Sequence, residues 1–243
     1  MSARVERAVR PLTVGPALLG LALAAWVVTV WRMRGMDMGP GTDLGGLGWY
    51  LGVWVTMTAA MMLPSALPMM LVVGRTSRSG TWPFAGGYLV VWTAYGLAAY
   101  GVSRLLAGAG FLAWDRAGPY VAGGAIAAAG LYELTPLKHV CLRHCRSPLG
   151  FVISRWRAGR VGALRMGAEH GAICVGCCWG LMLVLFALGV MSLLWMAVVG
   201  AVIFVQKVLP AGDRLAVLFA ALLVAAGVWL AAWPGSFPGL VQP

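Results

Sequence analysis

Seven blocks of mostly apolar residues, each about 20 residues long, follow one another along the chain. They lie at about 12–31, 50–73, 84–106, 118–137, 171–188, 191–209 and 214–233. A helix of ~20 apolar residues is long enough to cross the ~30 Å hydrocarbon core of a bilayer. No charged residue interrupts the core of any block except the fourth, which contains Glu133 near its end. The pattern predicts an all-α, polytopic transmembrane helix bundle of about seven helices.

The composition excludes the main alternatives to a membrane protein. Apolar residues make up 61% of the 243 residues and charged residues only 10%, whereas a soluble domain carries about 25% charged residues. A water-soluble globule, a disordered chain and a collagen-like fibre are therefore excluded. Because the seven blocks use most of the chain, we expect a single integral membrane domain over residues 1–243.

The basic residues indicate how the helices are oriented. With the N-terminus in the cytoplasm and the C-terminus outside, cytoplasmic segments hold 14 of the 18 Lys and Arg residues, as the positive-inside rule requires. The net charge of +11 is thus explained without a nucleic-acid partner. The longest connection, 138–170, is predicted to be a basic cytoplasmic loop between the fourth and fifth helices. Its segment 151–165 is suited to a short helix along the anionic inner leaflet.

Five cysteines fall into two groups with helical spacing. Cys141 and Cys145 are four residues apart and share a helix face with Lys138. The row His170, Cys174 and Cys178 has the same spacing, and Cys177 lies beside it. Both groups lie near the predicted cytoplasmic ends of their helices. They meet in space if the fourth and fifth helices pack as neighbours.

Thiolate sulfur combined with imidazole selects Cu(I), zinc or iron–sulfur clusters over Mg²⁺ or Ca²⁺. We therefore predict a metal site, with copper as the first choice and zinc, iron or iron–sulfur as alternatives. Buried cysteines that act only as small apolar residues and a redox dithiol of Cys174 with Cys177 stay open. The predicted ligands are Cys141, Cys145, His170, Cys174, Cys177 and Cys178.

Methionines line the second block and the loop before it. Pro64 and Pro68 each remove a backbone hydrogen bond within that helix, which suggests a break or bend that opens the helix onto a cavity. The alternative is a kink packed by flexible methionines. A sulfur-lined path from the outer loop to the cysteines would consist of Met36, Met38, Met57, Met61, Met62 and Met69.

Three charged residues are candidates for supporting roles as second-shell groups or proton carriers. An ionisable residue within a membrane helix is a functional candidate by default, which applies to Glu133; a carboxylate paired with Lys138 is the alternative. Glu169 adjoins His170 and is a candidate to orient a ligand. No catalytic residue is predicted from these patterns.

Three segments carry a family resemblance: 60–69 (AMMLPSALPM), 134–148 (LTPLKHVCLRHCRSP) and 171–182 (GAICVGCCWGLM). They are similar to the signatures of the DUF2182 family of bacterial integral membrane proteins, and the likeness runs from about residue 36 to 209. The resemblance implies a multi-helix protein with a metal site, with copper as the expected metal, in a bacterial inner membrane. One departure is Gln206-Lys207, where the family pattern has Glu-Lys.

Two functions follow from these features. The first is binding or delivery of copper through the methionine and cysteine clusters, with a metallochaperone as partner. The second is a membrane-bound, metal-dependent oxidase or oxygenase, or its subunit, which acts on a hydrophobic substrate with a redox partner. A third role, as an assembly subunit that forms oligomers or contacts oxidase subunits through glycine-rich faces, also stays open.

Overall fold

The computed structural model describes residues 3–34, 44–77, 79–112, 117–189, 192–209 and 212–233, with side chains from Val14 onward apart from that of Asp213. Over these ranges the chain forms nine helices and no strand, which confirms the predicted all-α bundle. The helices are α1 (Ala3–Met33), α2 (Leu47–Thr76), α3 (Thr81–Gly108), α4 (Gly118–Glu133), α5 (Pro136–Cys145), α6 (Pro148–Arg155), α7 (Gly159–Leu188), α8 (Leu193–Val208) and α9 (Gly212–Ala232).

Five helices are long and apolar enough to cross a membrane. The candidate spans are Val14–Met33, Leu47–Thr76, Thr81–Gly108, Gly159–Leu188 and Arg214–Ala232. The other two predicted spans correspond to α4 and α8, which have 16 residues each. At 1.5 Å per residue such a helix is about 24 Å long, less than the hydrocarbon thickness.

The fourth predicted span, 118–137, is divided into two helices by a local sequence signal. Helix α4 ends at Glu133, and α5 begins at Pro136, the first position of a helix that proline favours. Thr135 has an extended backbone and caps α5, because its hydroxyl accepts a hydrogen bond from the Lys138 N–H. The chain therefore changes direction before the first cysteine group.

The segment 138–170 is largely helical. It contains most of α5, all of α6 and the first turns of α7. Helix α7 begins at Gly159, 12 residues before the predicted start at 171. As a result Cys174 lies in the middle of this 30-residue helix and not near one of its ends.

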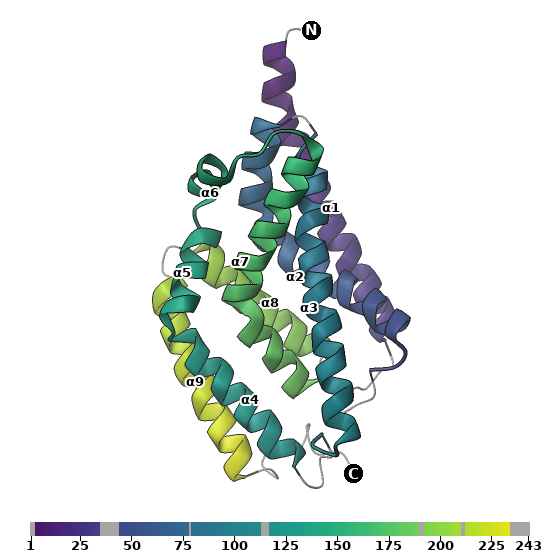
Figure 1. Ribbon diagram of the computed structural model, residues 1–243, viewed down its shortest axis with the longest axis vertical. Helices are drawn as coiled ribbons and strands as arrows, with labels where there is room; N and C mark the ends of the chain where they lie inside the picture. The colour runs from purple at the N-terminus through teal and green to yellow at the C-terminus, as the bar shows by residue number, and fades with distance from the viewer. Residues whose placement is uncertain are drawn as a thin grey trace.

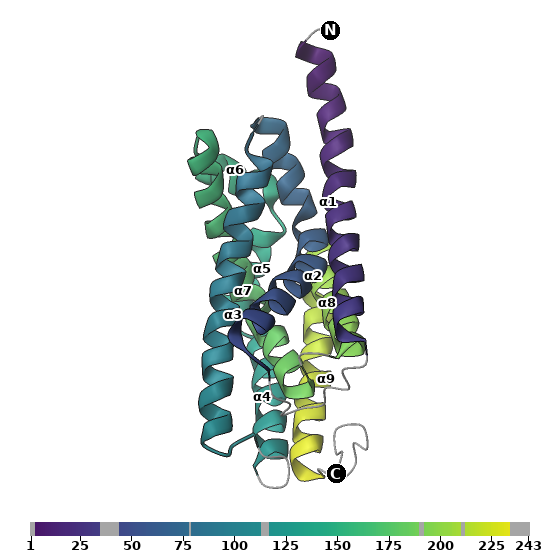
Figure 2. The same cartoon turned by 90° about the vertical axis from the view of Figure 1, so that its right-hand side faces the viewer.

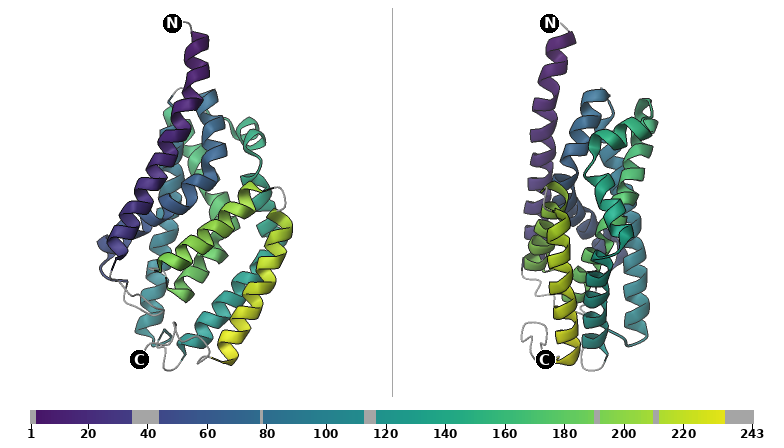
Figure 3. Two further views of the ribbon diagram at one scale, coloured as in Figure 1. Left: turned by 180° about the vertical axis from the view of Figure 1, so that it is seen from behind. Right: turned by 90° about the vertical axis from the view of Figure 1, so that its left-hand side faces the viewer.

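The helices form an elongated bundle in which α7 is central (Figures 1 and 2). It packs against α3 on one side and against α4, α5 and α8 on others. Helices α4 and α9 lie side by side in one half of the molecule. Seen from behind, α8 crosses the bundle and its end meets the start of α9 near mid-height (Figure 3). The start of α1 and the end of α9 lie at opposite ends of the long axis.

Glycines let α3 and α7 approach at backbone distance. A Cβ atom at Gly87 of α3 would lie 2.0 Å from the carbonyl oxygen of Leu164, and one at Gly167 of α7 would lie 2.0 Å from that of Phe84. Small residues at helix contacts are the usual basis of close packing in membranes, where apolar side chains gain little by leaving lipid for protein. This contact sets the position of α7, which carries three of the cysteines.

The substitution Gly87→Ala is expected to destabilise the bundle by about 1–3 kcal/mol, because the new methyl group overlaps the α7 backbone. The matched control is Gly86→Ala in the same helix, where a Cβ atom would have no neighbour within 4 Å. The control should be neutral or slightly stabilising because alanine favours helix. Denaturant unfolding in detergent micelles measures both variants, and equal stabilities would contradict the close-contact argument.

Candidate metal centre

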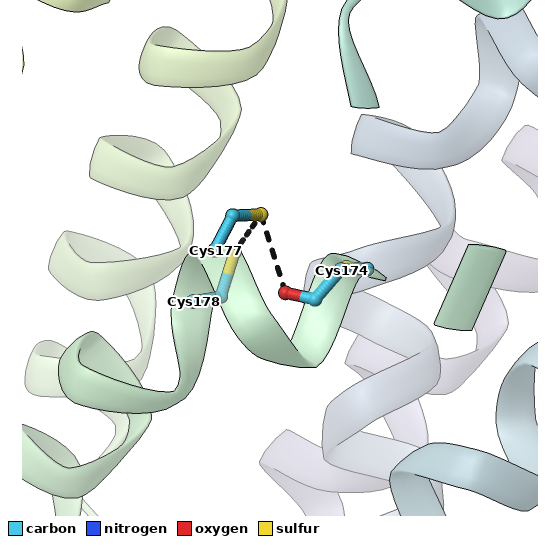
Figure 4. Close-up of side chains that lie close together, drawn as sticks. All are labelled: Cys174, Cys177 and Cys178. Carbon is cyan, nitrogen blue, oxygen red and sulfur yellow. Dashed lines mark hydrogen bonds between the residues drawn. The ribbon is translucent and has the colours of Figure 1, made fainter. Parts of the chain in front are cut away.

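Three buried cysteines of α7 form a compact sulfur cluster. The sulfur atoms of Cys174, Cys177 and Cys178 all lie within 4.8 Å of one another. The Sγ atoms of Cys177 and Cys178 are 3.2 Å apart, and the Cys177 thiol donates a hydrogen bond of 3.2 Å to the carbonyl oxygen of Cys174 (Figure 4). Helical spacing explains the cluster, since residues three and four apart share one face.

Helix α5 adds a fourth sulfur. The Sγ of Cys145 lies 3.6 Å from that of Cys177. All five cysteines are free thiols. The two cysteine groups that the sequence places on neighbouring helices therefore meet through Cys145. We use "sulfur cluster" below for Cys145, Cys174, Cys177 and Cys178.

Cys141 lies one turn away from Cys145 and contacts another part of α7. Its sulfur would be 2.9 Å from a Cβ atom at Gly176, so it occupies the space that this glycine leaves open. Burial raises the pKa of the Cys141 thiol, so the free residue is neutral at neutral pH. Its proposed role as a ligand stays a prediction.

Lys207 of α8 points at the sulfur cluster. Its Nζ donates hydrogen bonds to the Cys174 sulfur at 2.8 Å and to the Ser65 hydroxyl of α2 at 3.4 Å. The Tyr88 hydroxyl of α3 also lies 3.0 Å from the Cys174 sulfur. Helices α3 and α8 thus contact Cys174 of α7 directly, and α2 joins them through Lys207. Sequence reasoning missed both Lys207 and Tyr88; the signal for Lys207 was an ionisable residue in an otherwise apolar block.

A buried polar trio of Glu133, Lys138 and Gln206 lies next to Lys207 and joins α4, α5 and α8. Lys138 and Glu133, both fully buried, form an ion pair, which is the paired arrangement left open above. Gln206 accepts from Lys138 at 2.9 Å and donates to Glu133 at 2.7 Å. Gln206 and Lys207 are adjacent in α8. Through Gln206 the end of this helix binds the Glu133–Lys138 ion pair, and through Lys207 it contacts the sulfur cluster.

His170 and Glu169 lie toward α6. His170 is buried one helical turn before Cys174, outside the group of three close sulfurs. Glu169 forms ion pairs with Arg157 at 2.7 Å and Arg155 at 3.3 Å. These contacts fasten the segment after α6 to α7.

The methionines of α2 are buried, and their helix is continuous. Helix α2 runs without interruption from Leu47 to Thr76 through Pro64 and Pro68, so the prolines do not divide it into two helices, although its ribbon changes direction along its length (Figures 1 and 2). Each proline removes only one helical hydrogen bond. The other hydrogen bonds of α2 and its close packing keep the helix intact. Met36 and Met38 lie outside the described residues. The buried methionines of the predicted path are Met57, Met61, Met62 and Met69.

The donor set of the sulfur cluster fits a soft metal ion. Its sulfurs come from two helices, and three of its four residues are buried. Thiolate ligands favour Cu(I), zinc or iron–sulfur clusters, whereas Mg²⁺ and Ca²⁺ take oxygen ligands. The buried carboxylate of Glu133 could supply oxygen ligands, but it already forms an ion pair with Lys138.

Comparison with known proteins agrees with this chemistry. A family model named PpoB2 and described as a copper chaperone matches residues 51–230, which include every cysteine. No curated protein and no solved structure matches the chain significantly. The match supports the copper-related part of the resemblance found in the sequence, though not the DUF2182 name. The chain belongs to the PpoB2 family of copper chaperones.

Proposed function

We propose that this protein binds Cu(I) at the sulfur cluster within a bacterial inner membrane and delivers it to a partner protein. The observation that supports this most directly is the convergence of cysteine sulfurs from α5 and α7 in the interior of the bundle. A buried group of thiols without disulfides suits a soft ion. The copper-chaperone family favours copper over zinc, iron or iron–sulfur.

Lys207 supplies a charge that such a site needs. A metal ligand is a thiolate and not a thiol, so two thiolates and one Cu(I) ion carry one net negative charge. A buried charge is costly unless an opposite charge lies beside it. The ammonium group of Lys207, 2.8 Å from the Cys174 sulfur, provides that opposite charge.

The proposed route to the cluster begins at the methionines. Helix α2 approaches the cluster through Ser65, which contacts Lys207. Met61, Met62 and Met69 are neighbours of Ser65 on successive turns and are buried. Thioether sulfur is a soft ligand for Cu(I). In the predicted orientation, with the N-terminus cytoplasmic and the C-terminus outside, Met36 and Met38 collect copper outside the membrane.

Delivery to another protein agrees with the family description. A metallochaperone or a copper-containing oxidase subunit is the class of partner that such a protein supplies. The alternative, an oxidase or oxygenase with this chain as its catalytic part, has less support. Catalytic metal sites add histidine or carboxylate ligands, and among the described residues the close metal-ligating group consists of cysteines.

The substitutions Cys174→Ser and Cys177→Ser are each expected to weaken Cu(I) binding by at least about tenfold, because a hydroxyl is a poor ligand for a soft ion. Competition with a Cu(I) chelator measures the affinity, and elemental analysis measures the metal bound per chain. Cys141→Ser removes a thiol outside the sulfur cluster and tests the predicted ligand role of Cys141, since a loss as large as in Cys174→Ser would add Cys141 to the ligands. Binding of zinc in preference to Cu(I), or full Cu(I) affinity in the Cys174 variant, would refute the proposed function.

The substitution Lys207→Met should also lower Cu(I) affinity by about tenfold or more, since it removes the charge that compensates the bound thiolates. Lys207→Arg keeps the charge and should restore part of the affinity. Ser65→Ala removes only the longer of the two lysine contacts and serves as the control. Chelator competition reports all three variants, and an unchanged affinity in Lys207→Met would show that Lys207 has a purely structural role.

A further inference from the structure

His170 is a buried imidazole beside the sulfur cluster. It is 2% exposed and precedes Cys174 by one helical turn, so the two Cβ atoms are about 5–6 Å apart. Its Nδ1 atom has no hydrogen-bond partner among the residues that the structure describes. Buried polar atoms are nearly always paired. An unpartnered imidazole nitrogen next to a group of thiols therefore needs an explanation.

Aromatic rings enclose this imidazole. The ring centroids of Phe84 and Tyr88 of α3 each lie 5.8 Å from that of His170, and the Phe151 ring of α6 lies 5.4 Å away. Tyr88 also reaches the sulfur cluster, because its hydroxyl lies 3.0 Å from the Cys174 sulfur. The imidazole is thus packed among aromatic rings directly beside the cluster.

Helix α6 covers the His170 imidazole. Phe151 is buried against His170, and the chain after α6 is fastened to α7 at two points. Glu169 pairs with Arg157, and the backbone N–H of Arg157 donates to the Met166 sulfur at 3.3 Å. Met166 is fully buried and precedes His170 by one turn. A thioether, an imidazole and a thiol therefore follow one another along a single face of α7.

We propose that His170 is a relay ligand through which Cu(I) passes between the sulfur cluster and the α6 end of the bundle. This inference rests on the proposed function. A neutral imidazole and a thioether are both ligands for Cu(I), and the donors at positions 166, 170 and 174 are spaced one turn apart. The ion moves as its bond to one donor forms while its bond to the previous donor breaks. It stays Cu(I) throughout, so the step requires no oxidant or reductant.

The test separates the rate of copper transfer from equilibrium binding. Protein in lipid nanodiscs is loaded with one equivalent of Cu(I) and mixed with bathocuproine disulfonate, whose coloured Cu(I) complex reports release over time. His170→Ala should hold the same amount of copper at equilibrium. Its rate of copper release should fall by at least about fivefold. The control is His144→Ala, an exposed histidine of α5, which should release copper at the wild-type rate.

A second variant tests whether the route passes under α6. Phe151→Ala removes the cover and should accelerate release when His170 is present, but not in the double variant with His170→Ala. A wild-type release rate in His170→Ala, or equal acceleration by Phe151→Ala in both backgrounds, would overturn the proposal. So would a loss of equilibrium copper in His170→Ala as large as in Cys174→Ser, since His170 would then be a ligand of the cluster itself. Absence of Cu(I) from the wild-type protein would instead refute the proposed function.

Discussion

The ammonium group of Lys207 lies inside an apolar helix bundle, where a charge is stable only beside groups that compensate it. Glu133, the buried carboxylate near the end of α8, is already paired with Lys138 and receives the amide of Gln206. The polar contacts of Lys207 are the Cys174 sulfur and the Ser65 hydroxyl. The hydrogen bonds that stabilise this charge therefore hold α8 against α2 and α7. They also place the Cys174 sulfur next to an ammonium group.

The neighbouring residue of α8 extends this constraint to the second cysteine group. Gln206 binds both members of the buried ion pair at the junction of α4 and α5. That junction determines where α5 begins, and α5 ends at Cys145, whose sulfur contacts Cys177. Two adjacent side chains of α8 thus hold α7 and α5 in the relation that brings their sulfurs together. The polar trio has a positioning role even though it does not supply the thiol ligands.

Much of this arrangement could be predicted from the sequence because it depends on local periodicity. The apolar blocks identify the long helices, and the spacing of Cys174 and Cys178 places them on one face. The sequence makes the meeting of the two cysteine groups conditional on neighbouring helices, and α5, a separate helix after α4, meets that condition by packing against α7. In contrast, the contact of Lys207 with Cys174 joins residues 33 positions apart, and no local pattern encodes it. The sequence shows Lys207 only as a basic residue near the end of an apolar block, and its partner lies on another helix.

The two short helices explain how polar groups come to lie deep in the bundle. A helix that crosses the whole membrane offers only its side chains, whereas a helix that ends inside the bundle also leaves backbone groups that need partners. At the end of α4 the Thr135 hydroxyl donates to the carbonyl oxygen of Tyr132 and accepts from Lys138 N–H. After α8 the Arg146 side chain donates to the carbonyl oxygen of Leu209. These hydrogen bonds flank the residues that hold Cys145 and Cys174 in place, since Thr135 caps the helix that carries Cys145 and Leu209 follows Lys207 by two residues. The length of α4 and α8 is therefore part of the construction of the site, because α4 ends at Glu133 and α8 ends one residue after Lys207, the two residues whose contacts join α8 to α4 and α7.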